Sequence, residues 1–163
     1  MPEFLLGVNP TQNDREAQFT LGTEAKDPRS RDFPVNIIRY VRAAGTIAAG
    51  RAVTLAADNT SEPYAVVATT ATGQPLYGIT LSAIDSQTNL FGWVAVKGLV
   101  NSVLAAGTWV QGGLLGPSAT AGSLIALATA DSADAAILAA INGVKIAAVD
   151  TASAAGSADV LIY

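Results

Sequence analysis

Ala43–Gly50 reads AAGTIAAG, and 62 positions later Ala105–Gly112 reads AAGTWVQG. Two further blocks follow in the same order: Tyr77–Ala83 (YGITLSA) is echoed by Asn142–Ala148 (NGVKIAA), and Trp93–Val96 (WVAV) by Asp159–Ile162 (DVLI). Repeats of this kind indicate one structural unit used twice, although a sequence this rich in alanine and glycine also produces similarity by chance. We expect two copies of one β-unit, at about 35–97 and 98–163, packed into one body.

The unit is predicted to consist of short β-strands. Apolar runs rich in valine, isoleucine and threonine alternate with turn residues, at Val35–Val41, Ala52–Ala56, Tyr64–Thr69, Tyr77–Ala83 and Gly92–Val96. Several short, regularly spaced strands predict an all-β fold, a small barrel or sandwich. Residues 131–141 alone carry helix signals, an N-cap candidate followed by good helix formers and then Asn142-Gly143. At most one short helix is therefore expected.

The missing residue types exclude several kinds of chemistry. The 163-residue chain contains neither histidine nor cysteine, which excludes imidazole-based catalysis, Cys–His machinery and disulfide bonds. Its net charge of −4 argues against nucleic-acid binding, because neutralising phosphates takes clustered lysine and arginine. No apolar run approaches the roughly 20 residues that cross a bilayer. We expect no cofactor, no metal, no nucleic-acid or membrane partner, and no enzymatic activity.

Residues 1–34 are predicted to form an extended N-terminal arm ahead of a β-rich body, residues 35–163. Seven of the nine lysines and arginines lie at or before Arg51, and the first 34 residues show no sustained periodicity. Such a segment is either a frayed terminus or an arm that docks on a partner. Large apolar and basic side chains spaced along it favour docking, and the expected anchors are Phe4, Leu5, Leu6, Phe19, Leu21, Arg29, Arg31 and Phe33.

Four blocks follow one another in the body: GTIAAGRAVTL at 45–55, YGITL at 77–81, GWVAVKG at 92–98 and AAGT at 105–108. In this order, over about Asn36–Tyr163, they resemble the capsid decoration (cement) proteins of tailed bacteriophages. The resemblance implies a structural protein on the outer capsid surface of the virion. It also implies assembly as a homotrimer that binds the major capsid protein, bridges its subunits and stabilises the icosahedral shell.

Two other functions remain open at this stage. A virion-surface or fibre-type module that recognises a host glycan would need exposed aromatic residues, and Trp93 and Trp109 are the tryptophans on which a sugar would stack. A hydrolase would need two carboxylates that converge on one cleft, whereas most carboxylates after Arg51 sit beside Ser, Thr, Asn or Pro, as in solvated turns. The low charged fraction, 13% against about 25% in a typical soluble domain, favours a protein that is packed into an assembly.

Overall fold

The computed structural model describes residues 8–27, 36–57, 62–127, 146–151 and 155–163. Within these ranges the regular structure is entirely β, which confirms the predicted fold class. The strands are β1 (Glu24–Lys26), β2 (Ile37–Ala43), β3 (Ala52–Leu55), β4 (Ala65–Ala68), β5 (Gly78–Thr80), β6 (Phe91–Ala106), β7 (Leu114–Pro117), β8 (Leu124–Ala126), β9 (Ile146–Ala148) and β10 (Gly156–Ile162). The short helix predicted at 131–141 lies outside the described residues.

Five strand pairings close the first half of the body into a barrel, called barrel 1 below. β2 pairs antiparallel with β6 and parallel with β4, β3 pairs antiparallel with β4 and β5, and β5 pairs antiparallel with β6. The second half, barrel 2, repeats the pattern. β6 pairs antiparallel with β10 and parallel with β8, β7 pairs antiparallel with β8 and β9, and β9 pairs antiparallel with β10.

The strand register in the two barrels follows the repeat seen in the sequence. Val41 of β2 lies opposite Gly92 of β6 in barrel 1. Val103 of β6 lies opposite Ala158 of β10 in barrel 2. These pairs are related by offsets of 62 and 66 positions, the same offsets that relate the repeated sequence blocks at these strands. Residues of these two blocks therefore occupy matching places in the two closed sheets. The YGITLSA and NGVKIAA blocks do not, because the pairing matches Ile79 of β5 with Ala147 of β9, an offset of 68 positions, whereas the two sequence blocks are 65 positions apart.

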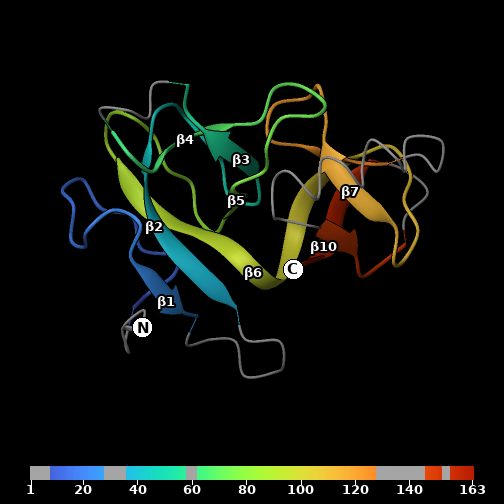
Figure 1. Ribbon diagram of the computed structural model, residues 1–163, viewed down its shortest axis with the longest axis horizontal. Helices are drawn as coiled ribbons and strands as arrows, with labels where there is room; N and C mark the ends of the chain where they lie inside the picture. Colours follow the sequence, from blue (N-terminus) through green and yellow to red (C-terminus); the bar gives the residue numbers. More distant parts are fainter. Residues whose placement is uncertain (1–7, 28–35, 58–61, 128–145, 152–154) are drawn as a thin grey trace.

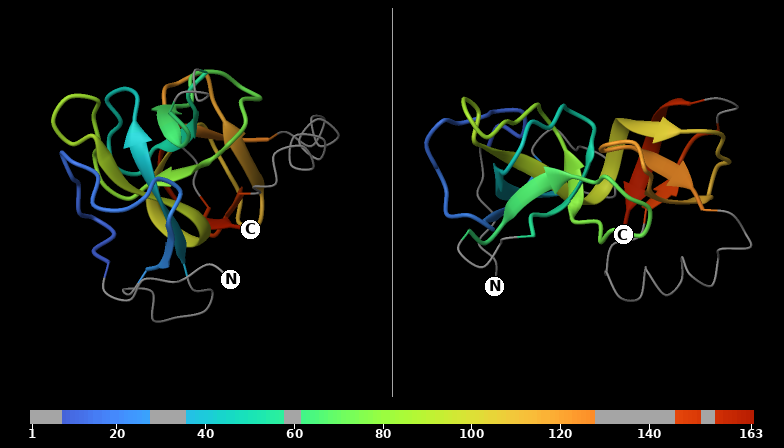
Figure 2. Two further views of the ribbon diagram at one scale, coloured as in Figure 1. Left: turned by 60° about the vertical axis from the view of Figure 1, so that its left-hand side comes forward. Right: turned by 90° about the horizontal axis from the view of Figure 1, so that it is seen from above.

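Strand β6 belongs to both barrels. Its residues up to Lys97 pair with β2 and β5, and its residues from Gly98 onward pair with β10. Gly98 has φ +106°, a backbone conformation that glycine adopts at little cost. The strand bends between the two barrels (Figure 1), which lie side by side along the long axis of the molecule (Figure 2).

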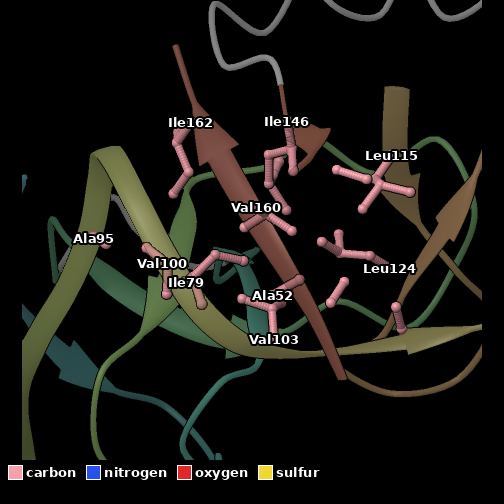
Figure 3. Packing of buried hydrophobic residues seen from close by; sticks show 14 of the residues in the cluster. Ala52, Ile79, Ala95, Val100, Val103, Leu115, Leu124, Ile146, Val160 and Ile162 are labelled. Atoms are coloured by element: carbon pink, nitrogen blue, oxygen red, sulfur yellow. The ribbon is translucent and has the colours of Figure 1, made fainter. Parts of the chain in front are cut away.

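One hydrophobic core runs through barrel 2 and across the junction. Ala52, Ile79 and Ala95 of barrel 1 join the cluster that contains Val100 and Val160 of barrel 2 (Figure 3). Backbone hydrogen bonds also cross the junction, from the amide of Ala52 to the carbonyl of Gly122 and from Leu104 to Gly50, both 2.9 Å. Because apolar packing and backbone bonds both span the junction, the barrels are held to each other as one body.

Candidate interaction site

Residues 8–27, called the N-terminal strap below, lie across the outer face of barrel 1 (Figure 1). Near its end, β1 pairs antiparallel with β2, with Ala25 opposite Ile38. Near its start, the backbone of Asp14 exchanges two hydrogen bonds of 2.9 Å with that of Phe91, the first residue of β6. The strap is therefore tied at both ends to the two neighbouring strands β2 and β6.

The strap is held by an aromatic cluster on the outside of barrel 1. Val41 and Val94 belong to the interior cluster of the barrel, so their neighbours Tyr40 and Trp93 point to the opposite face. Tyr40 and Trp93 are Cα partners with ring centroids 5.0 Å apart. Phe19 of the strap packs on both rings, with centroid distances of 5.2 Å to Tyr40 and 5.3 Å to Trp93. Without the strap this aromatic surface would face water.

Polar contacts accompany this packing. The Tyr40 hydroxyl donates a hydrogen bond of 2.9 Å to Oδ2 of Asp14, and Gln12 Nε2 donates one of 2.9 Å to Oδ1 of the same carboxylate. The backbone amide of Gln18 points at the Tyr40 oxygen, 3.3 Å away. Burial, with a further contribution from the Asp14 carboxylate, raises the pKa of Tyr40 to about 12. Tyr40 thus stays protonated and continues to donate to the strap throughout the neutral range.

A second polar group holds β1 to the barrel. The guanidinium of Arg39 on β2 forms an ion pair with Glu24 on β1 and donates a hydrogen bond of 3.0 Å to the hydroxyl of Tyr77. Burial raises the pKa of Tyr77 against the opposing effect of Arg39. The amide of Asn13 adds a hydrogen bond of 2.6 Å to the carbonyl of Ala83. The strap is therefore anchored by polar contacts along its length as well as by aromatic packing.

An open hollow of about 500 Å³ lies between the strap and barrel 1. Its lining consists of Ala17, Phe19, Thr20 and Leu21 from the strap and Arg42, Glu62, Pro63, Leu90 and Phe91 from the barrel. Arg42 and Glu62 form an ion pair, while most of the remaining lining is apolar. The hollow thus presents aromatic and aliphatic walls together with one pair of opposite charges, a surface suited to an apolar side chain of a protein partner.

Strained backbone borders this hollow at Tyr64. Tyr64 has φ +68°, a conformation that is uncommon for a residue with a side chain. Its carbonyl accepts a hydrogen bond of 3.1 Å from the amide of Arg42. Its ring lies over Gly22 of the strap, where a Cβ atom would come within 2.5 Å of the ring. The ring of Tyr64 therefore packs against the strap at Gly22, where the absence of a Cβ atom leaves room for the ring.

The structure describes two of the eight predicted anchors. Phe19 and Leu21 are half-buried in the strap, packed against the outer aromatic cluster of their own barrel, and their remaining surface lines the hollow. The other six lie outside the described residues: Phe4, Leu5, Leu6, Arg29, Arg31 and Phe33.

The residues that hold the strap were not identified from the sequence as a site. Tyr40 and Val41 are neighbours on β2, and Trp93 and Val94 are neighbours on β6. Each pair places large apolar side chains on both faces of its strand. A strand that is apolar on both faces is typical of one covered from both sides. This signal could have predicted a cover over the outer face, although it does not name the covering segment.

Three of the described carboxylates, those of Asp85, Asp150 and Asp159, hold local structure. Asp85 accepts hydrogen bonds from the amides of Gln87 and Thr88 at 2.8 and 2.6 Å and from the Thr88 hydroxyl at 2.7 Å, and these bonds lower its pKa to about 2. Asp150 accepts a 3.0 Å bond from Trp109 Nε1, and Asp159 a 3.0 Å bond from the amide of Ser102. Among the described residues no group of acidic side chains has the arrangement of a metal site.

Neither tryptophan offers a surface on which a sugar would stack. Trp93 is 1% exposed and Trp109 is 2% exposed. The exposed aromatic residues in the described ranges are Tyr64 on barrel 1 and Tyr163 at the end of barrel 2. The described residues also include no helix of the length and apolarity that a membrane crossing requires.

No family model matches this chain, and no curated protein matches it either.

Proposed function

We propose that the chain is a structural, non-enzymatic protein of a bacteriophage virion. It binds the outer surface of an icosahedral capsid, as an assembly of three copies, and stabilises the shell by bridging subunits of the major capsid protein. The resemblance of the body to capsid decoration proteins suggests this role. The low charge of the chain and its duplicated barrels support it, because both suit a protein that works by packing against neighbours.

The observation that carries the proposal is that several described charged side chains form hydrogen bonds or ion pairs within the chain. The carboxylates of Asp85, Asp150 and Asp159 cap a turn or hold a neighbouring segment, and Arg39 holds β1 to its barrel. These groups are committed to internal contacts and do not converge on a cavity. At the hollow the body offers a partner a mostly apolar surface with one pair of opposite charges, Arg42 and Glu62, which suits recognition by shape.

A repetitive shell makes such weak contacts effective. Each contact need contribute little, because linked copies bind neighbouring sites at a high effective concentration. Phe19 and Leu21 are committed in part to the chain's own barrel, so the proposed capsid anchors are the residues on either side of the strap: Phe4, Leu5, Leu6, Arg29, Arg31 and Phe33. The hollow beside Phe19 adds an apolar place for a capsid side chain.

The test is uptake of the purified full-length chain by capsid shells that lack it. We expect saturable binding at a fixed ratio to the major capsid protein, and shells that release their contents at a higher temperature. Replacing Phe4, Leu5 and Leu6 with alanine should weaken uptake at least tenfold. Leu55→Ala, an exposed position on β3, is the control and should bind as the unaltered chain does. Absence of uptake at micromolar protein would contradict the proposal.

A further inference from the structure

Arg51 lies at the junction of the two barrels, directly before β3. The next residue, Ala52, packs in the core that both barrels share (Figure 3), and its amide donates a hydrogen bond to the carbonyl of Gly122 in barrel 2. The stem of Arg51 lies over the same glycine: a Cβ atom at Gly122 would come within 2.8 Å of the Arg51 Cβ and 3.1 Å of its Cδ. Gly122 therefore leaves room for the arginine, whose stem is held by packing where the barrels meet.

The guanidinium of Arg51 lacks an acceptor for one of its nitrogens. Nη1 is buried and, within the part of the chain that the structure describes, has no hydrogen-bond partner. The described ion pairs are formed by other arginines, Arg39 with Glu24 and Arg42 with Glu62. A cationic N–H group that has lost its hydration without gaining an acceptor raises the free energy of the folded chain. Nothing that the structure describes compensates this cost.

The repeated unit does not need this charge. Arg51 follows the AAGTIAAG block, and the residue that follows the matching AAGTWVQG block in barrel 2 is Gly113. The strands that come next, β3 and β7, pair with β5 and β9 in the same register. Because the turn and the strand after it form in barrel 2 without a basic residue, folding of the unit does not account for the guanidinium of Arg51.

The position suits recognition of a carboxylate. Arg51 is half-buried, so part of its side chain remains open to solvent. A guanidinium binds a carboxylate through two parallel N–H···O bonds, and a stem already held by packing loses little conformational freedom on binding. Nη1 has no described hydrogen bond to lose when the guanidinium turns toward such a ligand. A phosphate backbone fits less well, because it needs clustered bases and the adjoining segments 69–76 and 117–123 contain no charged residue.

We propose that Arg51 binds a carboxylate side chain of a capsid subunit at the junction of the two barrels. The inference deepens the proposed function and rests on it for the identity of the partner. A bidentate ion pair tolerates few orientations, whereas apolar contacts are not directional. A charged contact at a place held by both barrels would therefore fix the position of the chain on the shell.

The first test compares the stability of two variants of the full chain by urea denaturation. Arg51→Met removes the charge and keeps an apolar stem. We expect its midpoint to equal or exceed that of the unaltered chain, because the buried charge has no partner to lose. Arg39→Met is the matched control: Arg39 pairs with Glu24 and donates to Tyr77, so its midpoint should fall. A fall of the same size in both variants would overturn the inference, because Arg51 would then be committed within the chain.

The second test detects the ligand without shells. In the full chain, labelled with nitrogen-15, the Nε–Hε resonance of Arg51 is followed by NMR as sodium acetate is added at constant ionic strength. We expect this resonance, identified by its absence from Arg51→Met, to shift toward saturation, with no comparable shift at Arg39. A resonance that acetate leaves in place, or equal shifts at both arginines, would overturn the inference. So would a shift with inorganic phosphate but not with acetate, because the site would then recognise a different anion.

The third test links the site to the capsid. Arg51→Met should reduce uptake by shells at least tenfold, whereas Lys97→Met, at an exposed base on β6, should bind as the unaltered chain does. Unchanged uptake of a folded Arg51→Met protein would overturn the inference and leave the proposed function standing. A chain that binds acetate at Arg51 but ignores shells would support a carboxylate site and contradict the proposed function.

Discussion

The hydroxyl of Tyr40 donates a hydrogen bond of 2.9 Å to Oδ2 of Asp14, and both residues are buried. Asp14 belongs to the strap and Tyr40 to β2, 26 residues later. The bond lies beside the ring of Phe19, which packs edge-on against Tyr40. Polar and apolar contacts therefore join the strap to barrel 1 at the same place, so that loosening either one exposes the other to water.

Removing the Tyr40 hydroxyl should destabilise the protein without removing the ring. Tyr40→Phe leaves Asp14 with the bond from Gln12 but without that from the phenol, and we expect a loss of about 1–2 kcal/mol in the free energy of unfolding. Urea denaturation measures this loss. Tyr163→Phe, at an exposed tyrosine, is the control and should change stability by less than about 0.5 kcal/mol. Equal effects of the two changes would contradict the role given to the buried bond.

The same tyrosine should make stability depend on alkaline pH. Burial raises its pKa from 10.0 to about 12 in the folded protein. Below pH 10 the phenol is protonated in both states, and its contribution is complete. Between pH 10 and pH 12 the unfolded chain loses this proton while the folded chain keeps it, so stability falls as pH rises. Denaturation at several pH values should show a smaller fall for Tyr40→Phe, and identical curves for both proteins would be inconsistent with this assignment.

Asp85 should make stability depend on pH at acidic pH. Its hydrogen bonds with Thr88 and Gln87 lower its pKa from 3.8 to about 2, so the stabilisation is complete above pH 3.8 and is lost as pH falls toward 2. The amide resonances of Gln87 and Thr88, followed by NMR, should titrate with a midpoint near 2. In Asp85→Asn this titration should disappear, while the remainder of the spectrum is preserved. A midpoint near 4 in the unaltered chain would contradict the contact geometry.

The positions of several strands along the chain could be predicted from the sequence. Runs of β-branched and aromatic residues between turn residues located β2, β3, β4 and β5 to within a few positions, because pleated surfaces select these side chains. The AAGT blocks also indicated the repeat. These signals are local, since each depends on residues within one strand and its adjoining turns.

The strap could not be predicted in the same way. Phe19 and Tyr40 are 21 positions apart. No local pattern states which segment covers a face or which residues become partners across strands. Tyr40 next to Val41 indicated that both faces of β2 are covered, but only the register of the folded chain identifies Asp14 and Phe19 as the cover. Anchors near the N-terminus were predicted to grip a partner, whereas Phe19 and Leu21 lie against their own barrel.

Shortening Phe19 should loosen the strap and leave both barrels folded. Phe19 is half-buried, so Phe19→Ala should cost about 2 kcal/mol, roughly half the loss for a fully buried phenylalanine. Trypsin cleavage at Arg15, an exposed residue of the strap, should become at least tenfold faster. Val110→Ala removes an exposed apolar side chain in barrel 2 and should leave that rate unchanged. A strap cleaved equally fast in both proteins would show that Phe19 does not hold it.

Gly98, at the junction, should tolerate substitution poorly. At φ +106° a side chain is strained, and a Cβ atom would also collide with Oδ1 of Asn36 and lie 2.7 Å from its Cα. Gly107 has φ +76° with nothing within 4 Å of its added Cβ, so Gly107→Ala measures the conformational cost alone, about 1–2 kcal/mol. Gly98→Ala adds the cost of overpacking, and we expect a total loss of about 3 kcal/mol or more in the free energy of unfolding. Calorimetry and urea denaturation measure the difference between the two variants, and equal losses would show that Asn36 moves aside and that the bend of β6 does not depend on this close approach.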